Sequence, residues 1–142
     1  MNITELNIAR VAAGVASIAA AAAVPPELEA RIEAAFRDGA TPDAVAALIK
    51  ETEAVAHSAA IAVEEASIVA NSPIRSIQEK RDARRLIADA ARDRERLQTA
   101  IMDLRERRKE LKADEENERR QVDEVLELIE VSLSETYALK YW

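Results

Sequence analysis

The sequence contains no cysteine, which excludes disulfide bonds, thiolate metal sites and a cysteine nucleophile. Glycine occurs twice and proline four times in 142 residues, well below their usual share. Aromatic residues make up only 3% of the chain. No segment combines alternating apolar and polar residues with the β-branched and aromatic enrichment of a strand. Thirty alanines, together with many Glu, Arg and Leu, favour helices instead. We therefore predict an all-α fold.

A regular apolar pattern runs through the second half of the chain. One position recurs there alternately every four and three residues, and this 3.5-residue period is typical of the seam of a coiled coil. We predict that the chain self-associates through this seam, whose apolar members include Ile87, Leu97, Ile101, Leu104, Leu111, Val122, Val125 and Ile129. Arg94 and Arg108 fall on the same seam. A charge at such a position lowers stability and selects register or partner, so we interpret both arginines as register-setting residues.

Helix start and stop signals divide the chain into two regions. We expect an Ala-rich helical region over residues 1–72, with helices at about 3–23, 27–37 and 42–70. A long charged coiled-coil helix with an aromatic C-terminal tail then follows over residues 73–142.

Two helix starts carry clear sequence signals. Asn2 with Glu5 three residues later matches a capping box, and Ser72 followed by Pro73 matches an N-cap with proline in the first turn. So short a link between two long helices favours an antiparallel hairpin. The fold class we predict is therefore a helical hairpin or bundle extended into a long coiled-coil helix.

Residues 112–118 are the most polar stretch of the long helix, and a break there would fold the tail back on the hairpin. We expect the helix to continue, because the stretch lacks Gly and Pro and the seam keeps its phase from Leu111 to Val122. An unbroken helix over residues 73–133 would be about 90 Å long at 1.5 Å per residue. That length implies self-association or a partner.

The net charge of −7 is unevenly distributed. Residues 1–72 carry a net charge of −6, residues 73–112 of +5, and residues 113–142 of −6. Acids are interleaved with the basic residues, as at Asp89 and Arg92, so we expect most charges to pair within or between helices. The alternative is that the basic segment 73–112 binds nucleic acid.

Motifs for chemistry are few. His57 shares a helical face with Glu53 and Glu64, but a di-metal bundle needs Glu-x-x-His motifs from two helices, and the sequence has none. We therefore interpret His57 as structural. No phosphate-binding loop and no nucleophile–base arrangement is present, so we predict no catalytic residue, no metal and no cofactor. A helix-turn-helix starting near Leu28 is weakly suggested, but no turn follows in Lys50–Ala70.

The uncharged run Val11–Val24 resembles the apolar core of a signal peptide, but it is Ala-rich and follows both Glu5 and Arg10. It is also shorter than the roughly 20 residues that cross a bilayer. We expect a retained helix that packs on another helix, no transmembrane segment, and a location in the cytoplasm or within an assembled particle.

The chain ends in an aromatic cluster, Tyr137, Tyr141 and Trp142. Tyr and Trp dominate interface hot spots, so these residues either dock a partner or cap the chain's own bundle.

These patterns predict a non-enzymatic structural, assembly or adaptor protein that acts through coiled-coil self-association and partner binding. Its partner would be a second copy or another helical protein. The alternative is a nucleic-acid-associated oligomer, a DNA-packaging or regulatory subunit, that uses the basic segment 73–112.

Overall fold

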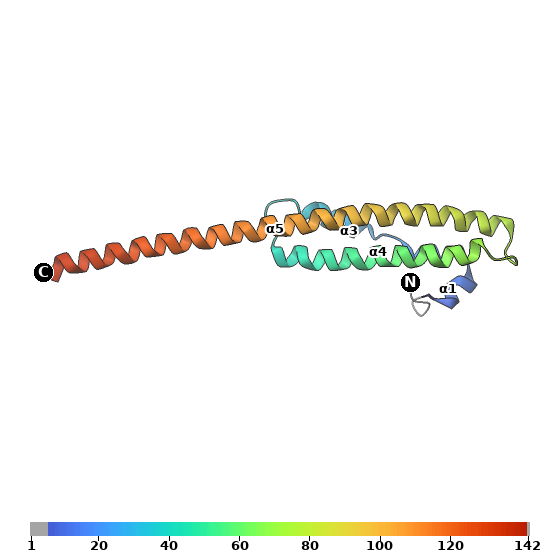
Figure 1. Ribbon diagram of the computed structural model, residues 1–142, viewed down its shortest axis with the longest axis horizontal. Helices are drawn as coiled ribbons and strands as arrows, with labels where there is room; N and C mark the ends of the chain where they lie inside the picture. The colour runs from blue at the N-terminus through green and yellow to red at the C-terminus, as the bar shows by residue number, and fades with distance from the viewer. Residues whose placement is uncertain (1–5, 142) are drawn as a thin grey trace.

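Five helices make up the computed structural model, which describes residues 6–141, with side chains up to Lys140. In chain order they are α1 (Ile8–Ala13), α2 (Val15–Ala22), α3 (Pro26–Ala34), α4 (Pro42–Ala70) and α5 (Ile77–Tyr141). The described part of the chain contains no strand. The all-α prediction is confirmed, and so is the helical hairpin, because α4 packs antiparallel along the first half of α5 (Figure 1).

Two apolar clusters hold the hairpin together. Near the start of α4, large aliphatic residues of α4 and α5 pack with Leu28 of α3. Near the hairpin turn, alanines dominate, and Ile18 of α2 packs in one buried cluster with Ala66 of α4 and Ala83 of α5. Alanine buries little surface but lets helix backbones approach closely, so this end of the molecule is thin and tightly packed. We call the hairpin with α1–α3 the body, residues 6–111.

The N-terminal segment is not the single helix expected over residues 3–23. Gly14 interrupts it with φ +107°, a conformation that side chains disfavour, and separates α1 from α2. Arg75 stabilises the break, because its guanidinium Nη2 donates to the carbonyls of Val11 at 2.7 Å and Ala12 at 3.3 Å. Asn7 caps α1, accepting from the backbone N–H of Arg10. The expected cap at residue 2 lies outside the described residues.

The connection from α3 to α4 is fixed by a side chain of α5 that is distant in the sequence. Arg107 of α5 donates to the carbonyl oxygen of Ala35 at 2.9 Å and to that of Arg37 at 3.3 Å. Thr41 then caps α4 by accepting from the backbone N–H of Ala44. Because Arg107 satisfies carbonyls at the end of α3, it fixes this loop against α5 at the level where α4 begins.

The expected start of the long helix at Pro73 is wrong. The helix begins at Ile77, and Ser76 is its N-cap, with Oγ accepting from the backbone N–H of Glu79 at 3.1 Å. Ser76-Ile77-Gln78-Glu79 has the capping-box spacing, and this cap lies one turn after the one that we expected. The link between α4 and α5 is therefore six residues long, 71–76.

Beyond the body, α5 continues through residues 112–118 without a break, as expected, and runs on to Tyr141. In Figure 1 this second half, coloured orange to red, extends past the body with no other helix beside it. Every described side chain from Lys112 to Lys140 is exposed. We call residues 112–141 the stalk. Within residues 6–141, no helix is both long and apolar enough to span a membrane.

Candidate assembly interface

The first half of the predicted seam is buried inside the hairpin. Leu97, Ile101 and Leu104 pack against Val45 and Leu48 of α4. Ile87 is half-buried against the alanine cluster at the other end, and Leu111 is half-buried where α4 begins. These seam residues contact the chain's own helices, so the seam available to a second chain begins after Leu111.

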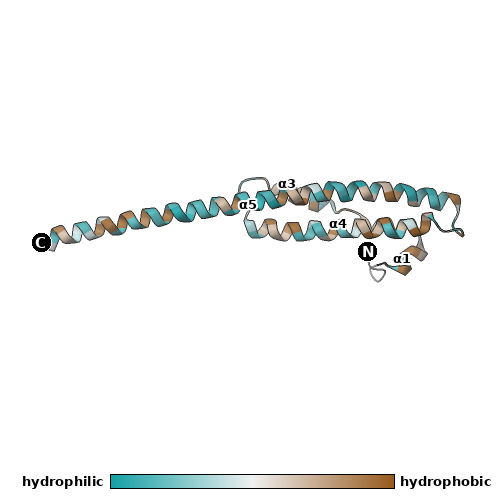
Figure 2. Ribbon diagram, viewed as in Figure 1, coloured by the Kyte–Doolittle hydropathy of each residue, from teal (hydrophilic) through white to brown (hydrophobic). Residues whose placement is uncertain are grey.

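The second half of the seam lies bare on the stalk. Val122, Val125 and Ile129 are each 50–57% exposed. They occupy the side of the helix that α4 covers in the body: Val122 follows Leu104, and Ile129 follows Leu111, by eighteen residues, or five turns of 3.6 residues. The face that forms the core of the body therefore continues uncovered along the stalk. Figure 2 shows the apolar residues recurring along it, in brown.

Two leucines that the 3.5-residue count left out belong to this face. Leu126 is 56% and Leu133 65% exposed, and with Val122 and Ile129 they are spaced four, three and four residues apart. The same alternation in a different phase would have found them in the sequence. We call Val122, Leu126, Ile129 and Leu133 the stalk stripe.

The two seam arginines lie in different environments. Arg94 is exposed beside Glu53 and His57, around a shallow hollow between α4 and α5. Arg108 is half-buried, and its Nε has no hydrogen-bond partner among the described residues. Both arginines lie in the part of α5 that belongs to the body, and their role in setting a register stays a prediction.

The aromatic tail does not cap the chain's own bundle at the one position whose side chain is described. Tyr137 lies on the stalk and is 66% exposed. The side chains of Tyr141 and Trp142 lie outside the described ones.

A hollow of about 430 Å³ marks the junction of body and stalk. The loop before α4 and the first residue of α4 form one wall, through Ala40 and Pro42. The other wall is α5, with Arg107, Leu111 and Glu115. The hollow lies at the point where α4 stops covering the apolar face of α5.

Models of known protein families, characterised proteins and solved structures give no match to this chain.

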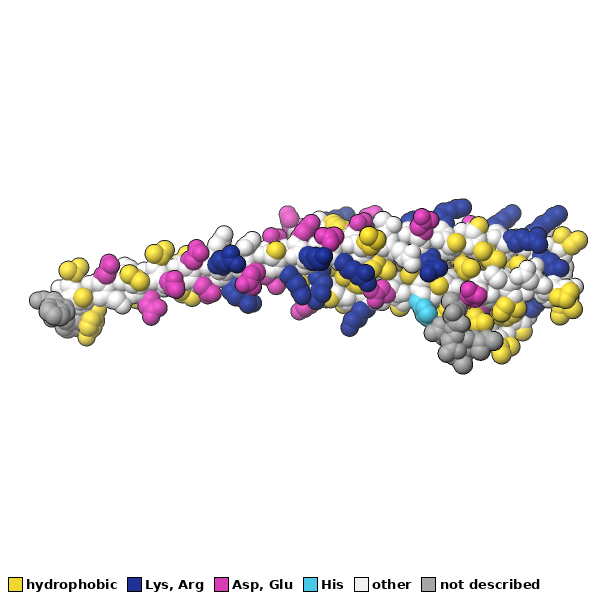
Figure 3. All heavy atoms as spheres, in the orientation of Figure 1, with side chains coloured by type: hydrophobic (Ala, Val, Ile, Leu, Met, Phe, Trp, Pro, Cys, Tyr) yellow, Lys and Arg dark blue, Asp and Glu magenta, His cyan; other side chains and the backbone are white. Residues whose placement is uncertain are grey.

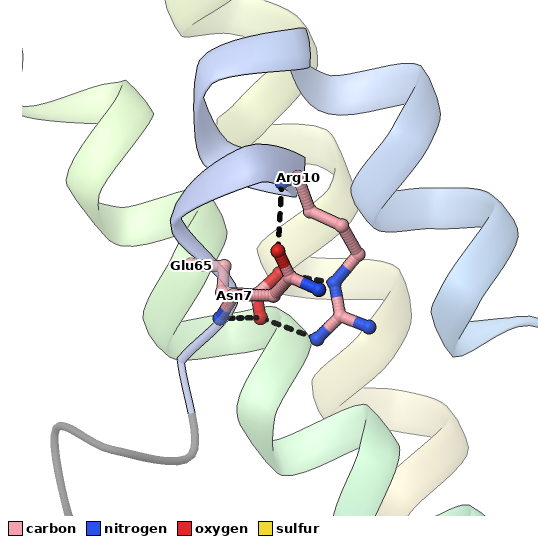
Figure 4. Close-up of polar contacts among 3 residues, drawn as sticks. All are labelled: Asn7, Arg10 and Glu65. Atoms are coloured by element: carbon pink, nitrogen blue, oxygen red, sulfur yellow. Dashed lines mark hydrogen bonds and ion pairs between the residues drawn. The ribbon is translucent and has the colours of Figure 1, made fainter.

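A buried carboxylate of the body has its hydrogen-bond partners within the chain. Glu65, 1% exposed on α4, accepts from Arg10 Nη2 at 2.6 Å, Arg10 Nε at 3.1 Å and the backbone N–H of Asn7 at 3.1 Å (Figure 4). The hydrogen bond to Glu65 raises the pKa of Arg10 above its ordinary value. This cluster fixes α1 on α4, and its hydrogen bonds are made between its own members.

A metal or ligand site has little support in the body. His57 is exposed on α4, and among residues 6–140 no three His, Asp or Glu side chains lie close enough to bind a metal ion. A hollow of about 400 Å³ between α3 and α4 is lined mainly by alanines. Its charged groups, Arg31 and Glu51, pair with each other.

Acidic residues pair with only part of the basic segment. Arg96 reaches Glu29 of α3 at 3.0 Å, and Arg105 reaches Glu53 of α4 at 2.9 Å. The exposed arginines Arg81, Arg84 and Arg85 make no ion pair with any described residue. In Figure 3 the basic side chains gather over the body and its hairpin end, whereas the stalk carries mainly acidic and apolar ones.

Proposed function

We propose that this chain is a non-enzymatic assembly protein, in which the body is a rigid base and the stalk is the interface for self-association. The observation that carries the proposal is the stalk stripe, an apolar face that is continuous with the core of the body and that no other described helix covers. The buried carboxylate of Glu65 is engaged by Arg10 and Asn7 within the body, which supports a structural role for it over a catalytic one.

The energetics of an isolated stalk favour association. Most of the stability of a helix in a protein comes from the packing of its amphipathic face rather than from helix propensity. Burying a Val, Leu or Ile side chain contributes about 1.5–3 kcal/mol relative to leaving it exposed. Association would bury the four members of the stalk stripe on each chain, which would stabilise the helical stalk and the assembly together.

Mass measurement by light scattering at micromolar concentration tests this function. We expect the full chain to be oligomeric and residues 1–111 to be monomeric, since both core clusters lie within the body. Leu126→Glu should disrupt the oligomer, because it places a charge on the stalk stripe. Leu128→Glu is the matched control: Leu128 is also exposed, at 70% against 56% for Leu126, but lies off the stripe. A monomeric full chain would refute self-association.

A second candidate function, nucleic-acid binding, is favoured by the three arginines without ion pairs near the hairpin end, Arg81, Arg84 and Arg85. Arginines that neutralise phosphates release counterions, so binding would be strongest at low salt. A fluorescence-anisotropy titration with duplex DNA at about 50 mM salt tests it, because electrostatic affinity falls steeply between there and 200 mM. The triple change of these arginines to Glu should abolish any binding, and no binding by the unmodified chain would end this candidate.

A further inference from the structure

One face of α5 serves two different neighbours along its length. In the body, α4 lies on the face that carries Leu97 and Leu104. Pro42, the first residue of α4, is level with Leu111, since both line the junction hollow. From there to the C-terminal end of α5 the same face is the stalk stripe. A second helix on the stripe would therefore lie end to end with α4 along one line.

This continuity decides the direction of a second copy. In a parallel copy, residues 77–111 would run straight back along the face of α5 that α4 already occupies. Shifting the parallel copy far enough to avoid α4 would instead set the stalk against the copy's own covered body. An antiparallel copy avoids both problems, because its body would extend beyond the C-terminal end of the first stalk.

Resting on the proposed self-association, we infer that the occupant of the stalk stripe is the stalk of a second copy of this chain, lying antiparallel. The four-three-four spacing of the stripe selects the register. Antiparallel pairing sets Val122 opposite Leu133 of the second copy and Leu126 opposite Ile129 of the second copy. The two-fold axis repeats both contacts, so four consecutive layers consist of aliphatic residues only.

The ends of this register are consistent with the rest of the stalk. Seven residues before Val122 is Glu115, and seven after Leu133 is Lys140, so these two side chains of opposite charge meet at each end. Glu115 also lines the junction hollow, so the C-terminal end of α5 of the second copy lies at the opening of this hollow. In this register Leu111 of the second copy, the last residue of its body, lies just past the C-terminal end of α5 of the first copy. The two bodies therefore do not overlap.

Cysteine cross-linking tests the direction, because the chain has no cysteine of its own. Val122→Cys and Leu133→Cys chains, distinguishable by a tag, are unfolded, mixed, refolded and oxidised mildly, and then separated on a non-reducing gel. We expect disulfide-linked pairs of one chain of each kind. Neither variant alone should cross-link, because the two Cα atoms at position 122 would be about 16 Å apart along the axis at 1.5 Å per residue. Bridged cysteines need Cα atoms within about 7 Å of each other.

Val131→Cys is the matched control. Val131 is 55% exposed, similar to Val122. It follows Val122 by nine residues, or two and a half helical turns, so it lies on the opposite side of the helix. It should not cross-link with either variant. All three sites are exposed, so the substitutions leave the body unchanged.

The outcomes separate this inference from the proposed function. Self-cross-linking of Val122→Cys alone, in an oligomer seen by light scattering, would overturn the antiparallel arrangement and leave self-association standing. A monomeric mass with no cross-link in any mixture would overturn both.

Discussion

The carboxylate of Glu65 positions the N-terminal helix on the hairpin. It lies within an apolar stretch of α4 and receives three hydrogen bonds from Asn7 and Arg10. Burial of a carboxylate is tolerated when it is paired and hydrogen-bonded in this way. The sequence could not predict this contact, because helical spacing relates neighbours three or four residues apart and this pair is separated by 55 residues.

Arg10→Ala should destabilise the body, because it leaves a buried carboxylate with only the backbone N–H of Asn7. We expect the free energy of unfolding to fall by about 1–3 kcal/mol. Urea unfolding followed by circular dichroism measures it, in the Leu126→Glu background so that dissociation does not contribute. Arg31→Ala is the control, since Arg31 pairs with an exposed carboxylate at the surface, and it should cost less than about 1 kcal/mol. Equal losses in the two variants would contradict the role of Glu65.

Charge exchange between Glu115 and Lys140 tests the register at single residues. Either Glu115→Lys or Lys140→Glu places like charges together at both ends of the antiparallel stalks, and each should weaken self-association by roughly twofold or more, as surface pairs do. The double variant restores opposite charges and should recover the original dissociation constant. Analytical ultracentrifugation measures all four proteins. If the double variant loses as much free energy of association as the two single variants together, the two residues do not contact each other.

Small residues determine how the helices of the body approach one another. Ala66 of α4 and Ala83 of α5 are fully buried, and Ile18 of α2 fills the space beside them. Composition predicted the helices, but not which alanines are buried. The residues that end or cap the observed helices are typical of helix boundaries and are present in the sequence. The prediction nevertheless chose the wrong boundary residues among the possible ones. Gly14 splits a helix because Arg75, distant in sequence, satisfies the exposed carbonyls, and Ser76 takes the cap expected of Ser72.

Ala83→Leu should overpack the contact among α2, α4 and α5. Extra methylenes in a close-packed site force shifted side chains or backbone, at a typical cost of about 1–3 kcal/mol. Ala88→Leu is the control on the same helix: Ala88 is exposed, so its replacement should change stability by less than about 0.5 kcal/mol. Thermal unfolding of both variants gives the comparison. An unchanged midpoint for Ala83→Leu would mean that the helices can separate at little cost.

At the scale of the molecule, α5 is one helix with two roles. Sequence alone predicted the continuous helix and the hairpin, because these follow from local signals and periodicity. It could not divide the seam between an internal and an external neighbour, since both use the same apolar pattern. That division depends on where α4 begins beside α5, which is a tertiary contact. The direction of a second copy follows from the same contact, because α4 blocks the parallel arrangement.

The antiparallel arrangement predicts an unusually long particle for its mass. In the register proposed, the two copies of Ile77 lie about 150 Å apart along the axis at 1.5 Å per residue, whereas a single α5, or a parallel pair, spans about 100 Å. Small-angle X-ray scattering should therefore give a maximum dimension near 150 Å at the mass of two chains. Leu126→Glu should lower it to about 100 Å at the mass of one chain, and Leu128→Glu should leave both values unchanged. A dimeric mass with a maximum dimension near 100 Å would require the stalks to lie side by side in the same direction, with α4 displaced from α5.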